Sequence, residues 1–151
     1  MKKILLIIAI AFVSFLDANA QVEYKVVTAV ESLVTSGAGR SRIIDGTEPK
    51  NYEDYTTVRS DDKNSDKKNK SDRGEIRIKN YEETKLLNFY NIAGIRFQNI
   101  AANDAVITSK INKLTAEGWE LAFVNTGVES DAGKGDGNAI FITRYTFKRN
   151  K

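Results

Sequence analysis

The stretch that decides the fold is "NDAVITSKINKLTAEGWELAFVN", residues 103–125, because it holds a helix and the strand that follows it. Three apolar residues recur at i, i+4 and i+7 and form one helical stripe: Ile107, Ile111 and Leu114. Asn103 is a typical N-cap residue, and Gly118 is a typical residue for the end of a helix. The stretch therefore predicts a helix over residues 103–117 and a strand that begins at Trp119.

Three further segments show the alternation of strands: residues 21–34, 40–45 and 139–149. In the first segment, five alternate residues share one face, opposite Glu23 and Lys25: Val22, Tyr24, Val26, Thr28 and Val30. Six aromatic residues are expected to pack in the core, with a small-molecule pocket as the alternative: Tyr24, Trp119, Phe123, Phe141, Tyr145 and Phe147.

A second helix is expected over residues 81–94, "YEETKLLNFYNIAG", where Leu86, Tyr90 and Ala93 follow the helical spacing. Together the segments predict an α+β fold. An antiparallel sheet of about four strands would pack against the helix over residues 103–117, with the second helix nearby.

The first twenty residues have the layout of a secretory signal peptide. Two lysines precede a thirteen-residue apolar run, "ILLIIAIAFVSFL", and the segment ends in Ala18-Asn19-Ala20. We therefore expect export to the periplasm or the exterior. Residues 21–151 would form one domain, with no membrane span after cleavage. Within it, residues 59–75 contain no apolar side chain and are expected to form a mobile charged insertion.

The composition excludes several classes of function. The chain has no His and no Cys, which removes catalytic Ser-His-Asp and Cys-His sites, the common zinc sites and any disulfide. Cleavage after residue 20 would remove two of 23 basic and one of 20 acidic residues, which leaves a net charge of +2. Charges of both signs alternate along the chain, so no nucleic-acid partner is expected. No cofactor is expected either.

Three motifs point to a known family: "YKVV" at residues 24–27, "LTAEGWELAFV" at 114–124 and "YTFKR" at 145–149. In these motifs the chain resembles the small bacterial domain of unknown function 4177 family. Its overall character is similar to that of exported proteins of Bacteroidota. The resemblance implies a compact antiparallel sheet packed on one helix, and it implies no catalytic residue. The chain departs from the family pattern by its signal peptide, its charged insertion and the segments 40–45 and 81–94.

Two segments are candidate ligand sites. Arg40 and Arg42 stand two residues apart on a predicted strand, so their guanidinium groups share a face and suit a carboxylate or sulfate. In the alternative interpretation they pair with acidic neighbours, for which Glu129 and Asp131 are candidates, or protect a sheet edge.

The second segment is "GVESDAGKGDGN", residues 127–138. The favoured interpretation is a flexible hairpin loop. A calcium loop of the EF-hand kind is excluded, because Gly133 and Gly135 occupy two ligand positions. A looser metal site and a phosphate cradle around Lys134 remain alternatives; the looser site would use four oxygen-bearing residues, Glu129, Asp131, Asp136 and Asn138.

From these observations we expect a small exported binding or interaction module without catalysis. Its partner would be a protein or a small anionic ligand. The alternative function is an anion- or metal-binding site, with or without hydrolysis, formed by Arg40, Arg42 and the loop over residues 129–138.

Overall fold

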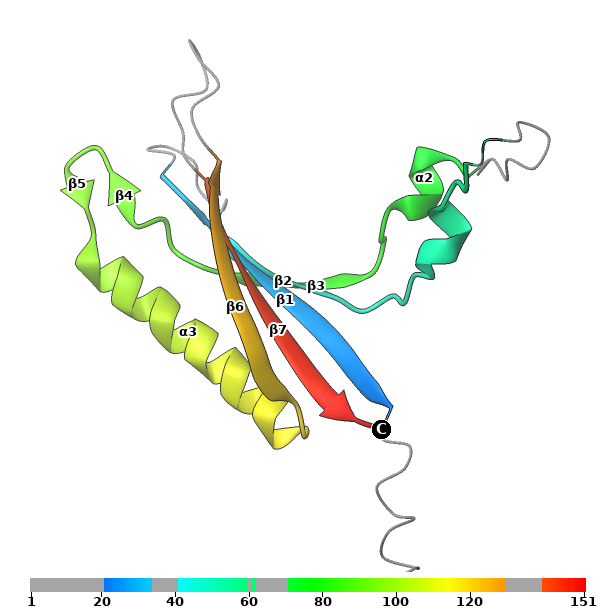
Figure 1. Cartoon of the computed structure of the whole chain (residues 1–151). Coiled ribbons are helices and arrows are strands. Elements are labelled where there is room, and N and C mark those ends of the chain that lie inside the picture. The colour runs from blue at the N-terminus through cyan, green and yellow to red at the C-terminus, as the bar shows by residue number, and fades with distance from the viewer. Residues whose placement is uncertain (1–20, 34–40, 60, 62–70, 130–139) are drawn as a thin grey trace, which may run out of the picture.

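The computed structural model describes residues 21–33, 41–59, 61, 71–129 and 140–151 (Figure 1). The predicted signal peptide, most of the charged insertion and most of the glycine-rich loop lie outside these residues. Three residues of the predicted insertion, 73–75, belong to a short helix, α2 (Arg73–Ile76). At its start, a carboxylate oxygen of Glu75 accepts a hydrogen bond from the backbone N–H of Asp72 at 3.1 Å.

A five-stranded antiparallel sheet organises the molecule, in the order β3-β2-β1-β7-β6. Its strands are β1 (Val22–Ser32), β2 (Arg42–Gly46), β3 (Tyr81–Lys85), β6 (Glu120–Glu129) and β7 (Ile140–Asn150). The α+β prediction is confirmed. The longest pairing joins β1 to β7 over eleven residues, from Val22 opposite Asn150 to Ser32 opposite Ile140.

One long helix, α3 (Phe97–Ala116), lies along one face of the sheet (Figure 1). The core between them consists of seven buried residues, Val27, Ala29, Ile43, Leu86, Leu114, Trp119 and Phe147. Ile107 and Ile111, on the predicted stripe, pack against this core. The stripe is therefore the face that α3 turns toward the sheet.

Gly118 ends α3 as predicted. Its φ of +87° is in the left-handed region, which glycine adopts without strain. The N–H of Trp119 donates to the carbonyl of Leu114, and the N–H of Gly118 donates to that of Thr115, both at 3.0 Å. This is the Schellman arrangement, and it turns the chain directly from the helix into β6.

The predicted start of this helix at Asn103 was wrong, because α3 begins at Phe97. Asn103 lies inside the helix and is buried. Its side-chain amide accepts from the N–H of Leu87 and donates to the carbonyl of Leu87, both at 2.8 Å, and also donates to Glu31 at 2.9 Å. Asn103 therefore satisfies the backbone of a neighbouring segment instead of capping its own helix.

The predicted helix over residues 81–94 was also wrong. Residues 81–85 form β3, and a small hairpin of β4 (Tyr90–Asn91) and β5 (Gly94–Ile95) follows. The reason is that β2 has an open edge on which β3 pairs over five residues. This pairing accounts for the fifth strand of the sheet.

The β2–β3 connection extends away from the sheet, on the side opposite α3 (Figure 1). It contains a short 3-10 helix, η1 (Tyr52–Tyr55), and α2. Polar contacts hold it together: the hydroxyl of Tyr55 and the ammonium of Lys50 both donate to the carbonyl of Glu75. We refer to residues 47–59 and 71–80 as the arm.

Candidate functional site

The face of the sheet opposite α3 is exposed. On β1, Val27 and Ala29 point toward the helix and are 2% and 1% exposed, so the alternate residues point to the other side. Three of those are exposed: Val22, Tyr24 and Val26. The apolar face predicted from the sequence of β1 is therefore the face that α3 leaves uncovered.

The strand registers show which residues share this uncovered side, which we call the open face. One row across three strands consists of Val26, Thr146 and Phe123. The next row consists of Tyr24, Lys148 and Glu120, and a further row includes Ile44, Thr28, Arg144 and Asn125. Tyr24 and Phe123 are 61% and 62% exposed, so two aromatic rings stand on a surface of the sheet.

These two residues correct the predicted aromatic core. Trp119 and Phe147 are buried as expected, and Tyr145 packs against the core. Tyr24 and Phe123 are instead open-face residues. Tyr24 was misplaced because β1 carries apolar residues on both faces between Val26 and Val30, and Phe123 was misplaced because an irregularity in pairing between Leu121 and Phe123 changes the alternation of β6. Apolar residues on both faces are typical of a central strand, and they indicate that the sequence of β1 does not decide which face packs against the helix.

The open face carries more positive than negative charge. Arg42 donates to Glu83 at 2.7 Å, and Lys148 lies 3.3 Å from Glu120. Lys85 and Arg144 lie on the same face and form no ion pair among the described residues. Two unpaired cations thus border the exposed aromatic and aliphatic side chains.

Of the four predicted ligand residues, Arg42 is the one whose backbone and side chain are both described by the structure. It lies on the open face, and an acidic partner is Glu83 on the neighbouring strand β3. The backbone of Glu129 is the end of β6, which two strands, β1 and β7, separate from β2. Three strand spacings separate β2 from β6 by about 14 Å, and the registers place Gly127, not Glu129, level with Arg42. Arg40 and Asp131 lie outside the described residues.

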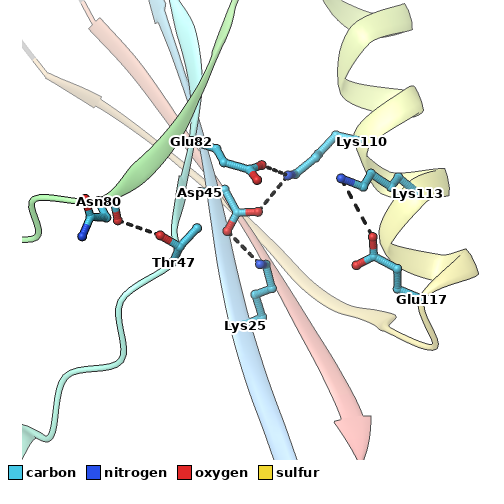
Figure 2. Close-up of polar contacts among 8 residues, drawn as sticks. All are labelled: Lys25, Asp45, Thr47, Asn80, Glu82, Lys110, Lys113 and Glu117. Carbon is cyan, nitrogen blue, oxygen red and sulfur yellow. Dashed lines mark hydrogen bonds and ion pairs between the residues drawn. The ribbon is translucent and has the colours of Figure 1, made fainter.

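On the helix side, a cluster of charges around the buried Asp45 joins four segments of the chain (Figure 2). The carboxylate of Asp45, on β2, lies 2.9 Å from the ammonium of Lys25 on β1 and 2.8 Å from that of Lys110 on α3. Lys110 also contacts Glu82 of β3 at 3.2 Å. Only about 4% of the Asp45 side chain is exposed. We call these four residues the Asp45 cluster.

The cluster keeps its charges fixed at neutral pH. Burial alone would raise the pKa of Asp45, but the ammonium groups of Lys110 and Lys25 outweigh burial and lower that pKa below its usual 3.8. Burial alone would lower the pKa of Lys110, but Asp45 and Glu82 raise it above its usual 10.5. Both shifts move titration away from neutrality. The arrangement therefore suits an ion-pair clamp between helix and sheet and not proton transfer.

A concave region lies in the arm. It is a hollow of about 730 Å³ lined by Glu48, Lys50, Gly74, Glu75, Arg77, Ile78 and Lys79. The carboxylate of Glu48 is already occupied, because it accepts from the backbone N–H and the side-chain amide of Asn80. Charges of both signs line the hollow, so it selects no particular class of ligand.

Two features are absent from the described part of the chain: closely grouped acidic side chains and a long apolar helix. Across residues 21–33, 41–59, 61, 71–129 and 140–151, no three acidic side chains gather closely enough to hold a metal ion. Among the same residues, no helix has the length and apolar character needed to cross a membrane.

Comparison with protein-family models, with curated proteins and with solved structures finds no match for this chain. The open face, the Asp45 cluster and the arm are therefore interpreted from their own geometry.

Proposed function

We propose that this protein is a small exported, non-catalytic binding module that docks a partner protein on its open face. The observation that carries the proposal is the exposure of Tyr24 at 61%, beside Val22 and Val26, on a sheet whose other face already holds the core. Aromatic residues are enriched at protein interfaces, and they supply a large contact area at a small cost in side-chain entropy.

The charges on this face favour a partner with acidic groups. Arg144 and Lys85 form no ion pair among the described residues, whereas Arg42 and Lys148 are partly neutralised by glutamates. A partner surface with an apolar centre and one or two carboxylates would match both features. The carboxylates of such a partner would play the part of the small anionic ligand that the sequence analysis gives as the other possible partner.

The resemblance to the domain of unknown function 4177 family supports a compact helix-on-sheet module and supplies no catalytic residue. Export forms part of the proposal, because the segment before Gln21 has the layout of a signal peptide. Mass spectrometry of the protein from its host would then give a mature chain that begins at Gln21. A chain that retains residues 1–20 would contradict export.

The docking proposal is tested by affinity capture from periplasmic and extracellular fractions, followed by titration of the captured protein. Tyr24→Ser and Arg144→Glu should each weaken binding at least about tenfold, because the first removes an aromatic contact and the second reverses a charge. The control is Ile92→Ser, which alters a side chain that is 91% exposed and lies between β4 and β5, away from the open face.

Equal affinity of the Tyr24 and Arg144 variants and of wild type for every captured protein would refute docking on the open face. An equal loss in the Ile92 variant would also refute it.

A further inference from the structure

The two edges of the sheet differ in length and chemistry. β3 forms one edge and has five residues, of which Glu82, Glu83 and Lys85 are charged. β6 forms the other edge and has ten residues, with no charged side chain from Leu121 to Val128. Short, charged strands protect a sheet edge from further pairing, whereas long apolar edges invite it. β3 is therefore a protected edge, and β6 is not.

The outer side of β6 is open to a further strand. Every residue from Phe123 to Val128 is exposed, including Val124 at 50% and Val128 at 57%. Among the described residues, the only strand that pairs with β6 is β7. In an edge strand, alternate N–H and C=O groups point away from the sheet, so this segment presents a row of unpaired backbone groups.

The regular part of β6 is symmetric about its middle residue. An irregularity in the pairing between Leu121 and Phe123 interrupts the strand, and the regular pairing then runs from Phe123 to Glu129. Thr126 is the midpoint of these seven residues. Antiparallel pairing of two copies about Thr126 would place Val124 of each copy opposite Val128 of the other. Such β-branched pairs stabilise neighbouring strands, as does a pair of threonines at the centre.

We propose that two copies of this chain pair through β6 in antiparallel orientation, about a twofold axis at Thr126. The result is a continuous ten-stranded sheet with both α3 helices on one side and both open faces on the other. The contact is isologous, because the same segment serves both copies, and it closes after two chains. The absence of charge between residues 121 and 128 removes like-charge repulsion across the axis.

This inference does not depend on the proposed function, because β6 pairing uses backbone groups at the edge of the sheet, whereas docking uses Tyr24 and Arg144 on its face. Capture of a partner by a monomeric protein would leave the docking proposal standing and overturn this one.

The test is the mass of the full exported protein by sedimentation over a range of concentrations. Wild type should be a dimer. Val124→Lys combined with Val128→Lys should raise the dimer dissociation constant at least about tenfold, because lysines then face each other twice across the axis.

Val124→Lys combined with Val128→Glu should restore the dimer. Opposite charges then meet between copies, whereas within one strand the two positions are about 13 Å apart and cannot pair. The matched control, Val22→Lys combined with Val26→Lys, adds the same charge on the open face of β1 and should leave the dimer intact.

A second measurement guards against variants that fail to fold. Hydrogen exchange of wild type should show amides of residues 123–128 that become protected as the protein concentration rises. A wild type that stays monomeric at the highest soluble concentration would overturn the proposal. So would a dimer that the β1 variant abolishes and the Lys-Lys variant of β6 does not, because the open face would then be the contact.

Discussion

The two faces of the five-stranded sheet are built from the same strands and yet differ in burial and in the pairing of their charges. On the helix side, Val27 and Phe147 are buried, and a cluster of opposite charges joins β1, β2, β3 and α3. On the open side, Val26 and Tyr24 of the same β1 are exposed. The difference shows that apolar alternation marks two faces of a strand, whereas a covering helix determines which of them becomes core. The first face should carry the stability, and the second should be available for contacts with partners.

The largest effect on stability should come from truncating Trp119, the core residue that follows the C-terminal end of α3. Trp119 is 7% exposed, and the guanidinium of Arg149 lies 4.3 Å from its ring centroid. Trp119→Ala should lower the free energy of unfolding by about 3–5 kcal/mol, because it leaves a cavity and removes a cation–π contact. Urea unfolding followed by circular dichroism measures this change. A midpoint close to that of wild type would mean that the helix side does not carry the stability.

The next effect concerns the buried charge on the same face. Asp45→Asn should cost about 3 kcal/mol, because it leaves Lys110, itself largely buried, without its closest carboxylate. Lys113→Met is the matched control: Lys113 is also on α3 but is exposed and 3.9 Å from Glu117, so its loss should cost a few tenths of a kcal/mol (Figure 2). Equal losses in the two variants would contradict a special role for the buried cluster.

The pH dependence of folding stability should distinguish the contribution of the Asp45 cluster from that of the apolar core. The pKa of Asp45 is lowered in the folded state, so its contribution is complete above its ordinary value of 3.8 and is lost as the pH falls through the lower folded-state pKa. The pKa of Lys110 is raised, so its contribution is complete below 10.5 and is lost as the pH rises through the higher folded-state pKa.

Thermal unfolding should therefore show a constant difference in Tm between wild type and Asp45→Asn across neutral pH, and a smaller difference below about pH 3.8. A difference that changes steadily between pH 5 and pH 9 would assign the effect to other groups.

The smallest effect should come from the open face. Tyr24→Ser should change the free energy of unfolding by no more than about 0.5 kcal/mol, because the side chain is mostly in solvent and is not part of the buried core. The same variant is expected to weaken partner binding, so stability and binding should separate. A loss above about 2 kcal/mol would show that Tyr24 supports the fold and that the two faces are less distinct than their exposure indicates.

The sequence alone determined several local elements of this protein. The stripe of Ile107, Ile111 and Leu114, the stop at Gly118 and the strands on either side of the glycine-rich loop were predicted, because side-chain periodicity and left-handed glycine are properties of short segments. The α+β class follows from the same elements. The family resemblance, export and the ligand residues Arg40, Arg42, Glu129 and Asp131 stay predictions.

Tertiary structure alone decided how these elements pack against each other and which side chains they bury. Tyr81–Lys85 was predicted as the first part of a helix and becomes a strand, because β2, some forty residues earlier in the chain, offers an edge with free backbone groups. Asp45 is buried only because Lys25 and Lys110 arrive from two other elements and compensate its charge. Tyr24 is exposed because α3 packs on Val27 and Ala29 and leaves the alternate residues of β1 uncovered. Each outcome depends on contacts between distant segments, and no local pattern contains that information.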